Sequence, residues 1–392
     1  MIRRVMLIPS WYPGSADPVN GIFVEDQAEV LAERFEVLVF VQRIYGWRQV
    51  AQGRLPSRAG FAMRRGIRLY EQSIVLPPRL PYRAVAAYLL RRARAAMQTI
   101  LHEWGSPDII HPHVVLPGGW VGTRLGRLLN VPVVLTEHTG PFSAHLTSSS
   151  RRALVRETLR ASNRVIAVSP SLSDQINAVD PLLKIEVLGN VIPTRFFFPV
   201  EGDTSEKGTP LRLFSASLLT KGKGYEYLLR AARMLLDAGF HRFQLVIGGD
   251  GPDRPRLDAM ITELNLRENC SMVGMLTRDE LRDRMRRSDL FVFPSLAETF
   301  GMVIGEAMAC GKPVLATHCG GADFQVTPKT GLLVKPGSAE ALAEGVRHFA
   351  EKRSEYSAAG IHAAVAERFG ETAFLDAVTC IYHDVAVRKV CA

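Results

Sequence analysis

Cysteine is scarce in this chain of 392 residues, and long apolar runs are missing. The five cysteines show no C-x-x-C spacing: Cys270, Cys310, Cys319, Cys380 and Cys391. This pattern argues against a disulfide framework and a zinc site, and it is typical of a cytoplasmic protein. No stretch approaches the roughly 18 uninterrupted apolar residues of a membrane-spanning helix, so none is expected. The first apolar run, residues 5–8, stops at Pro9 and is too short for a signal peptide.

Acidic residues are sparse in one half of the chain. The formal net charge is +9, and residues 1–200 hold 24 Lys and Arg against 14 Asp and Glu. Most of the excess lies between Arg43 and Arg94, which predicts a polyanionic partner for this half. Residues 81–104 show helical amphipathicity with a basic side, and such a helix either packs with that side solvated or rests on anionic lipid headgroups. Without a nucleic-acid-binding motif, nucleic acid is not expected as a partner.

Short apolar runs of strand type alternate with helical patterns along the chain. Two series of strands are expected, at 5–8, 37–41, 109–111, 133–136, 165–168 and 185–188, and at 211–216, 244–248, 271–273, 290–293, 314–316 and 332–334. Runs that are apolar on both faces predict parallel sheets covered by helices. The polar stretch 199–210, with its glycines and prolines, separates the two series. The fold class is therefore α/β, with two doubly wound Rossmann-like domains that bind ligands beyond the carboxyl ends of their strands.

The segment 294–321 carries the most specific pattern, PSLAETFGMVIGEAMACGKPVLATHCGG. A helix is expected over 301–309, which places Glu298 in the loop before it and Glu306 in its second turn. A helix that begins near Phe300 and Gly301 offers unpaired N–H groups and partial positive charge, which suit a diphosphate. Glu306 suits the vicinal hydroxyls of a ribose, and Glu298 those of a sugar. Glutamates near a helix start are also common as solvated acids without a binding role. The surrounding sequence frame must therefore distinguish a binding site from a solvated pair.

That frame, E-T-F-G-M-x-x-x-E-A-M-A-C-G-x-P-V followed by G-G, resembles the E-x7-E segment of retaining GT-B glycosyltransferases of family 4 (group 1), of the type that assembles polysaccharides and lipopolysaccharides. Most of the chain shares the resemblance, including PDIIHPH at 107–113, VPVVLTEHTG at 131–140, KGYEYLLRA at 223–231 and GGDGP at 248–252. It implies an acceptor-binding domain over 1–199, a linker over 200–210, a nucleotide-sugar-binding domain over 211–370 and a helix over 371–392 that crosses back to the first domain, with a central cleft between the domains.

The resemblance also implies the site residues. Glu298 and His138 would be the catalytic residues that orient the donor sugar, and Lys223 would neutralise the diphosphate. The other substrate-binding positions are Gly21, Ser217, Gly249, Gly274, Phe300, Gly301, Met302 and Glu306. Ser217 stands where the family usually has an arginine on the phosphates, and Lys221 is the nearest substitute. His113, which shares an H-x-H pattern with His111, is a second-rank candidate, and a metal site is not expected.

The implied activity is transfer of a hexosyl group (EC 2.4 class) from a nucleoside diphosphate sugar to an acceptor hydroxyl with retention, without metal or cofactor. The basic first half and the opening W-Y-P…G-I-F-x-x-x-Q indicate a lipid-linked or glycan acceptor in bacterial surface polysaccharide or lipopolysaccharide synthesis. The protein would then be cytoplasmic or peripheral at the inner face of the membrane. Two alternatives stay open: a non-catalytic GT-B subunit of a polysaccharide assembly machine, and another GT-B chemistry such as sugar-nucleotide epimerisation. The donor sugar, base, acceptor and linkage have no short signature.

Overall fold

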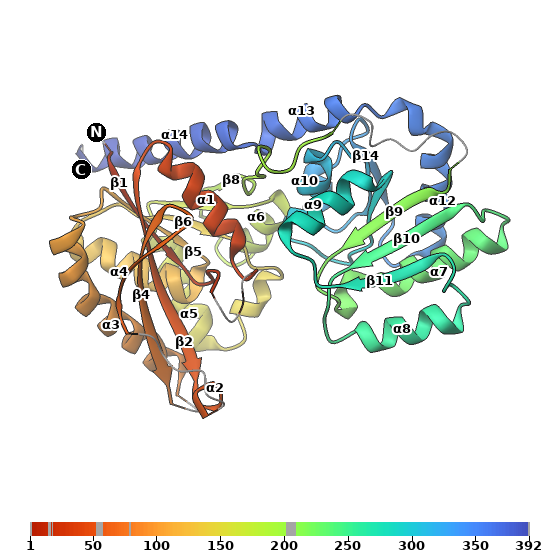
Figure 1. The fold of residues 1–392 in the computed structure, drawn as a ribbon. Coiled ribbons are helices and arrows are strands. Elements are labelled where there is room, and N and C mark those ends of the chain that lie inside the picture. Colours follow the sequence, from red (N-terminus) through yellow and green to blue (C-terminus); the bar gives the residue numbers. More distant parts are fainter. Residues whose placement is uncertain are drawn as a thin grey trace. The chain divides into compact units, whose positions relative to one another are not determined.

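The computed structural model describes residues 2–14, 17, 19–51, 58–77, 80–200 and 209–390. The chain divides into two compact units, Met1–Asn190 with Phe374–Ala392, and Val191–Ala373. Each unit is a sheet of mostly parallel strands with helices on its faces (Figure 1). Most of the linker expected over 200–210 lies outside the described residues.

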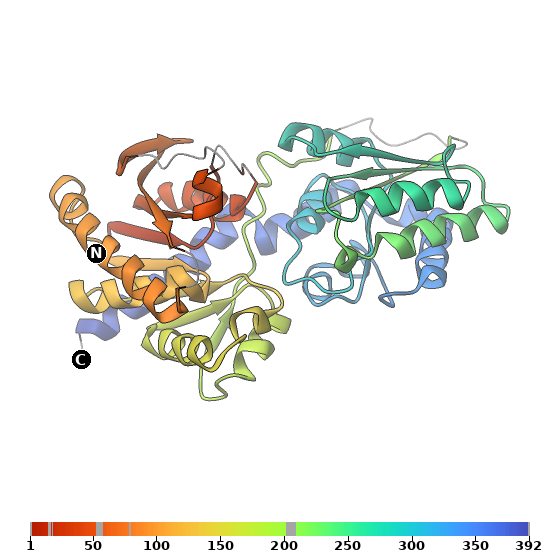
Figure 2. The same cartoon turned by 90° about the horizontal axis from the view of Figure 1, so that it is seen from below.

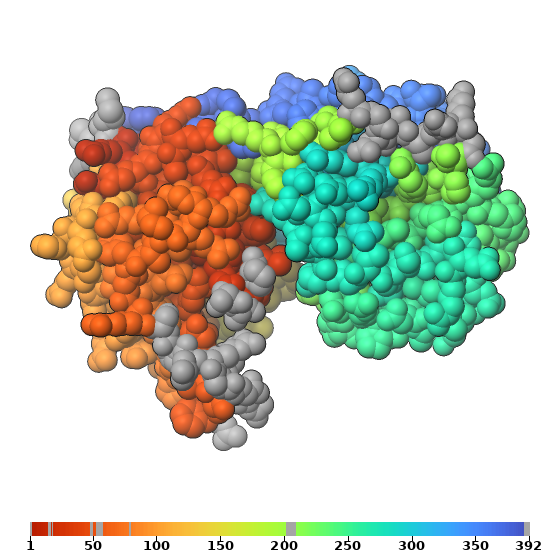
Figure 3. All heavy atoms as spheres, viewed as in Figure 1, coloured from red at the N-terminus to blue at the C-terminus, as the bar shows by residue number. Residues whose placement is uncertain are grey.

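The first unit ends at Asn190 rather than at the expected residue 199. Residues 191–199 pack on the second unit instead, where the Ile192 N–H donates to the Phe369 carbonyl at 2.7 Å. The guanidinium of Arg286 lies 4.2 Å from the centre of the Phe198 ring. In Figure 3 this green segment lies on the surface beside the turquoise helix that contains Arg286. The segment therefore belongs to the second unit by its contacts.

The first unit contains an eight-stranded sheet in the order β3-β4-β2-β1-β5-β6-β7-β8. Its strands are β1 (Arg4–Pro9), β2 (Glu36–Gly46), β3 (Gly60–Arg64), β4 (Ile67–Leu76), β5 (Ile109–His113), β6 (Val134–Glu137), β7 (Arg164–Ala167) and β8 (Ile185–Val187). β3 and β4 pair antiparallel, and the other neighbours pair in parallel. The sequence predicts every strand but β3 and β4. β4 mixes buried and partly buried positions, and β3, at the sheet edge, has no buried position, so a search for continuous apolar runs passes over both.

The helices of the first unit are α1 (Ile22–Ala32), α2 (Trp47–Ala51), α3 (Tyr82–Glu103), α4 (Trp120–Leu129), α5 (Ser149–Ala161) and α6 (Pro170–Asn177), with short turns η1 (Val115–Gly119) and η2 (Phe142–His145). α3 is the amphipathic helix that the sequence predicts, and its apolar side packs in the core with Phe40 and Tyr70 of the sheet. The last helix, α14 (Glu371–Val390), begins in the second unit and joins the first from Phe374 onward. No helix in the described part of the chain is long and apolar enough to cross a membrane.

The second unit contains a six-stranded parallel sheet in the order β11-β10-β9-β12-β13-β14. Its strands are β9 (Leu211–Ala216), β10 (Phe243–Gly248), β11 (Cys270–Gly274), β12 (Leu290–Phe293), β13 (Val314–Thr317) and β14 (Gly331–Val334). Its helices are α7 (Tyr225–Asp237), α8 (Arg254–Glu263), α9 (Arg278–Arg287), α10 (Met302–Ala309), α11 (Gly321–Gln325), α12 (Ala339–Lys352) and α13 (Ala358–Phe369), with turns η3 (Lys221–Lys223) and η4 (Arg353–Glu355). α7, α8 and α12 cover one face, and α9 and α10 lie on the other (Figures 1 and 2).

Each sheet reverses its strand order at one place, between β1 and β5 in the first unit and between β9 and β12 in the second. Ligands of doubly wound sheets bind outside the carboxyl ends of the strands at such a reversal. Gly21 follows β1 and His113 ends β5, whereas Lys223 follows β9 and Glu298 follows β12. Both expected Rossmann-like domains are confirmed, and these four candidate residues lie at their reversal points.

Candidate functional site

Lys223 and Glu298 meet at the reversal point of the second sheet. The Lys223 Nζ lies 2.5 Å from Glu298 Oε2, and the two side chains are 23% and 19% exposed. The Thr299 N–H donates to the other carboxylate oxygen at 3.1 Å. The ammonium of Lys223 also lies 5.8 Å from the centre of the Phe293 ring. The two residues therefore form a partly buried ion pair, and a phosphate that approaches Lys223 competes with Glu298 for its ammonium.

The paired glycines that close the sequence motif hold Glu298 in place. Its N–H donates to the Cys319 carbonyl at 2.7 Å, and its carbonyl accepts from the Gly321 N–H at 2.8 Å. Glu298 and Gly320 thereby form a short parallel bridge. A Cβ on Gly321 would lie 2.4 Å from the Phe300 carbonyl oxygen, so a side chain has no room there. These backbone hydrogen bonds fix the loop that carries Glu298 to the loop after β13.

Helix α10 starts directly after this loop. Gly301 is its N-cap with φ 83°, a conformation that favours glycine, and no side chain caps the helix. Phe300 is buried, and its carbonyl accepts a hydrogen bond from the Gln325 side chain. Met302 begins the helix, and Glu306, which is 6% exposed, lies in its second turn. The first N–H groups of α10 therefore lack a side-chain partner at the end where a helix attracts anions.

The loops after β9, β10 and β11 interlock at the same edge of the sheet. Gly249 has φ 117°, and a Cβ there would lie 1.9 Å from the Ser217 carbonyl oxygen. Its N–H donates to the Gly274 carbonyl at 2.7 Å. The Ser217 hydroxyl lies 3.0 Å from the Tyr225 hydroxyl of α7, so it bonds within its own unit. The structure thus brings Ser217, Gly249 and Gly274 together, and Lys223 forms the ion pair while Lys221 stays exposed.

Three histidines form a buried row in the first unit, which we call the histidine row: His111, His113 and His138. The first two lie on the same face of β5, as two residues of a strand separated by one position do. Ring centroids are 4.5 Å apart between His111 and His113 and 5.2 Å apart between His113 and His138. Burial lowers the pKa of His138 to about 4 and that of His111 to about 3. Both rings are therefore neutral at physiological pH.

Glu137, which the sequence reasoning missed, holds the backbone around His138. The carboxylate is fully buried and accepts from the N–H groups of Val115 at 2.6 Å, His138 at 2.8 Å and Thr139 at 2.7 Å. Burial opposes its ionisation, but the bond to His145 and these backbone N–H groups hold the pKa of the carboxyl below its usual value. An acid at the end of an otherwise apolar strand was the available signal.

Gly21 and His138 are linked through the first turn of α1. Gly21 is the N-cap of α1 with φ 79°, and a Cβ there would lie 2.3 Å from the Trp11 carbonyl oxygen. The Phe23 ring lies 4.5 Å from the His138 ring, centroid to centroid. The glycine therefore allows the close turn that brings Phe23 against His138. Phe23 belongs to the opening motif G-I-F-x-x-x-Q, but nothing in the sequence places it against His138.

Four of the arginines whose excess between Arg43 and Arg94 predicts a polyanionic partner have partners within the unit. Arg64 and Arg65 pair with the buried carboxylate of Glu25 on α1. Arg43 pairs with Glu71, and the Arg68 guanidinium lies 4.4 Å from the centre of the Phe61 ring. Arg54 lies outside the described residues. These contacts neutralise the buried Glu25 of α1 and the partly buried Glu71 of β4, which the charge count alone does not reveal.

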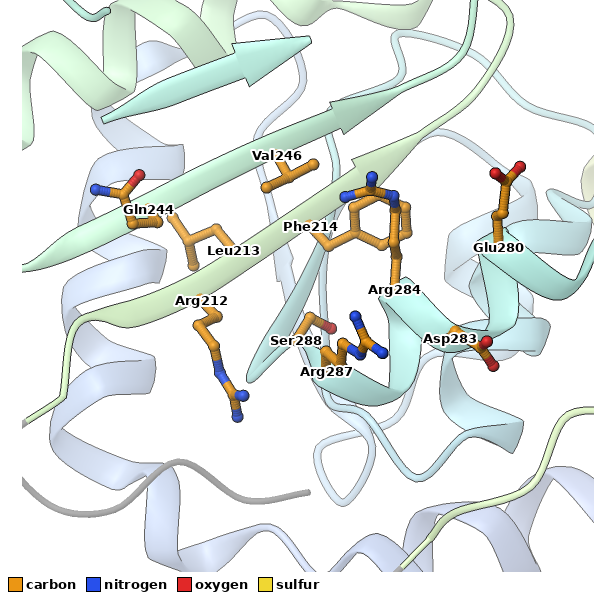
Figure 4. Close-up of a pocket in the computed structure, with 10 residues that line it drawn as sticks. All are labelled: Arg212, Leu213, Phe214, Gln244, Val246, Glu280, Asp283, Arg284, Arg287 and Ser288. Carbon is orange, nitrogen blue, oxygen red and sulfur yellow. The ribbon is translucent and has the colours of Figure 1, made fainter. Parts of the chain in front are cut away.

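A cavity of about 320 Å³ in the second unit is lined by none of the predicted site residues. Arg212 and Phe214 of β9, Val246 of β10 and Arg284 and Arg287 of α9 line it (Figure 4). Among the described residues, no group of three or more His, Cys, Asp or Glu side chains is placed to hold a metal ion.

Comparison with known proteins gives the family. The model for Glycosyltransferase Family 4 matches residues 21–196, and the model for Glycosyl transferases group 1 matches residues 201–365. Together they span most of the chain, so the protein belongs to the group 1 glycosyl transferases, and it is a glycosyltransferase of the GT-B type.

The relatives agree over nearly the whole length. The chain is 27% identical over 370 residues to TuaC of Bacillus subtilis (strain 168), named as a teichuronic acid biosynthesis glycosyltransferase, covering 88% of this chain and 89% of that protein. It is 28% identical to D-inositol 3-phosphate glycosyltransferase 1 of Catenulispora acidiphila, with 78% of each covered. The fold matches sucrose-phosphate synthase of Thermosynechococcus elongatus with a TM-score of 0.77 at 21% identity, covering 98% of this chain and all of that one. Anabaena HepE, solved with UDP, matches with a TM-score of 0.73 at 21% identity over the same shares.

Proposed function

We propose that this glycosyltransferase moves a hexosyl group from a nucleoside diphosphate sugar to an acceptor hydroxyl with retention of configuration. The observation that carries the proposal is the Lys223–Glu298 ion pair beside the uncapped start of α10, at the reversal point of a doubly wound sheet. The ammonium and the free N–H groups match a diphosphate, and the carboxylate matches sugar hydroxyls. HepE, a structural neighbour, was solved with UDP and with UDP-glucose, which supports a donor of this class.

In this proposal the leaving diphosphate accepts the proton of the acceptor hydroxyl on the same face of the sugar. The protein then supplies positioning and charge stabilisation rather than a covalent nucleophile. Lys223 and the backbone near Gly301 stabilise the leaving group, and Glu306 holds the ribose. Glu298 and His138 orient the sugar, and the turn at Gly21 completes the acceptor side. The reaction proceeds without metal or cofactor.

The proposed acceptor is a lipid-linked or glycan chain of a bacterial surface polysaccharide or lipopolysaccharide. TuaC is named for teichuronic acid biosynthesis, and another structural neighbour is named as the lipopolysaccharide outer core galactosyltransferase WaaB, which supports this class. The protein would work in the cytoplasm, peripherally at the inner face of the membrane.

The first unit offers one surface for anionic headgroups. Arg152, Arg156 and Arg160 are exposed and recur every fourth residue on α5. They line a groove of about 540 Å³, and Arg160 also lines a second groove that contains Arg127. The protein should pellet with sedimented vesicles of anionic lipid, and the R152A/R156A variant should stay in the supernatant. Equal binding of both proteins to anionic and to zwitterionic vesicles would contradict it.

Nucleotide-dependent thermal stability tests the donor site. The purified protein is heated with UDP, GDP or ADP and their sugar conjugates, without metal and then with magnesium. At ligand about 100 times its dissociation constant, binding stabilises the fold by roughly 2.7 kcal/mol, which gives a clear rise in Tm. A metal-independent rise with one nucleotide, lost in K223A, supports the proposal. A folded protein that responds to no nucleotide contradicts it.

A non-catalytic GT-B subunit is the second candidate, and one contact favours it. Ser217 is uncharged and its hydroxyl bonds to Tyr225, so this position supplies no positive charge to a diphosphate. Polymer production in cells that carry Glu298→Ala separates the two functions: normal production would support the non-catalytic subunit. A donor that turns over without any added acceptor would instead indicate epimerisation or another chemistry of this fold.

A further inference from the structure

We propose that His113 is a positioning residue for His138: its imidazole holds the His138 ring in one plane and sets whether the free nitrogen of His138 donates or accepts a hydrogen bond. The proposal rests on the function proposed above, in which His138 faces a sugar hydroxyl. It assigns a role to a buried histidine, named above only as a second-rank candidate, that lies outside the E-x7-E segment and the diphosphate site.

A single hydrogen bond joins the two rings. His113 Nδ1 lies 3.0 Å from His138 Nε2. The other ring nitrogens, Nε2 of His113 and Nδ1 of His138, are buried and make no close hydrogen bond among the described residues. The Asn190 side chain beside His138 raises the pKa of that ring, against the larger effect of burial. Burial lowers the pKa of both rings, so each carries one ring proton at neutral pH. Nδ1 of His138 is therefore one of two ring nitrogens of this pair that remain for a ligand, the other being Nε2 of His113.

Two neutral imidazoles joined in this way have only two arrangements. In one, His138 Nε2 donates to His113, and His138 Nδ1 is left as an acceptor. In the other, His113 Nδ1 donates to His138, and His138 Nδ1 carries its proton and is a donor. A sugar hydroxyl both donates and accepts, so it fits either arrangement. Exchange between the two reverses the polarity presented to the ligand while both rings stay uncharged.

The surroundings fix the His113 ring strongly enough for this role. It stacks on His111 with an interplanar angle of 25° and on His138 with 26°. His111 is itself held at both nitrogens, by the Tyr382 hydroxyl at 2.6 Å and the Thr136 hydroxyl at 2.7 Å. On its other side, the His138 ring contacts Phe23. His138 thus lies between the Phe23 ring and the His113 ring, and His113 in turn stacks on a histidine that is bonded at both nitrogens.

The backbone after His113 is unusual and supports the same conclusion. Val114 adopts φ 73°, which is an outlier for a β-branched residue. Such conformations persist where the surrounding structure over-determines them, often beside a functional group. Here the Val114 N–H donates to the Thr136 carbonyl at 2.8 Å, and the His113 carbonyl accepts from the Ser10 N–H at 3.1 Å. The end of β5 is therefore locked on both sides of the histidine.

Two substitutions separate the hydrogen bond from the volume of the ring. His113→Phe keeps an aromatic ring but removes the bond, whereas His113→Asn keeps a polar atom near the position of Nδ1. We expect H113F to lower kcat about tenfold, which corresponds to about 1.4 kcal/mol, with KM for the nucleotide sugar changed less than about twofold. H113N should recover most of the loss. Equal defects in H113F and H113N, or a defect confined to KM, would overturn the proposal.

A matched control uses the neighbouring residue Ile110, which is fully buried on β5. Ile110→Val removes one methyl group. None of the contacts described above joins Ile110 to a ring of the histidine row, so I110V should lower Tm while kcat stays unchanged. A kcat loss in I110V equal to that in H113F, at a similar drop in Tm, would assign the effect to general destabilisation and would overturn the role of the bond.

A spectroscopic test needs no substrate. Ring-¹⁵N NMR of histidine-labelled protein reports which nitrogen of His138 carries the proton. The ratio of the two tautomers should change in H113F and return toward the wild-type value in H113N. An unchanged His138 spectrum in H113F would overturn the proposal. Because this spectrum is independent of turnover, a wild-type protein with the expected coupling but without transferase activity would refute the proposed function alone.

Discussion

Removing either half of the Lys223–Glu298 ion pair should change nucleotide affinity in opposite directions. The ammonium and carboxylate are 2.5 Å apart and about one fifth exposed, so the pair is a charge-assisted hydrogen bond that a bound diphosphate must replace. Such bonds contribute about 1.5–3 kcal/mol, and partial exposure favours the lower end. Glu298→Gln keeps the shape of the side chain but removes the charge that competes for Lys223.

We therefore expect E298Q to bind UDP, or whichever nucleotide stabilises the protein, about three- to tenfold more tightly than the wild type, while its transfer activity falls. K223A should bind the same nucleotide about ten- to hundredfold more weakly. Isothermal titration calorimetry at one fixed ionic strength measures both. Lys329→Ala is the control, because this exposed lysine precedes β14, at the opposite edge of the parallel sheet from the loops that carry Lys223 and Glu298, and the nucleotide affinity of K329A should change less than about twofold. Weaker nucleotide binding in E298Q would refute the reasoning.

Three further predictions concern stability. Gly224→Ala should destabilise the second unit by about 3 kcal/mol or more, because its Cβ would lie 2.1 Å from the Pro294 carbonyl oxygen at φ 67°. The control Gly239→Ala, at φ 80° with open space around it, should cost only about 1–2 kcal/mol, and equal Tm shifts would contradict the prediction. The free energy of unfolding in urea should fall as pH drops from about 6.5 toward 4, by up to about 1.4 kcal/mol per pH unit for each buried histidine. The folded pKa values of these histidines lie below the ordinary value, so the unfolded chain binds protons first. A flat profile from pH 7 to 4.5 would exclude this. Glu137→Ala should destabilise the first unit by about 3 kcal/mol or more by leaving buried N–H groups without an acceptor, and chemical denaturation with Glu137→Gln as the milder control measures it.

The parallel strands were predictable because they are buried on both faces, and burial on both faces leaves a continuous apolar run in the sequence. β3 and β4 have one partly exposed face and carry arginines such as Arg64 and Arg68, so they lack that signature. The unit boundary was misplaced for a related reason. Polarity marks residues 199–210 as a linker, but packing of Phe198 against Arg286 assigns the residues before it to the second unit.

The candidate site also has a part that the sequence predicts and a part that it does not. Glu298, Gly301 and Glu306 lie in one contiguous motif whose spacing is visible in the sequence, and the structure places them around the start of α10. The residues that support His138 come from separate elements: Glu137 ends β6 and Phe23 belongs to α1. No local pattern connects residues that meet only through the order of strands in a sheet. The roles of all these residues in transfer remain predictions that the variants above test.

Helix α14 has a consequence for the order in which the protein folds during synthesis. Its residues from Phe374 onward complete the first unit, with Val378 and Tyr382 fully buried there. Arg34 of the first unit also pairs with Asp376 of this helix at 2.8 Å. The ribosome must therefore finish the whole second unit before the first can close its core. We expect the nascent N-terminal unit to expose the surface that receives Tyr382 throughout that interval, which makes it a client for chaperones although its sheet is translated first.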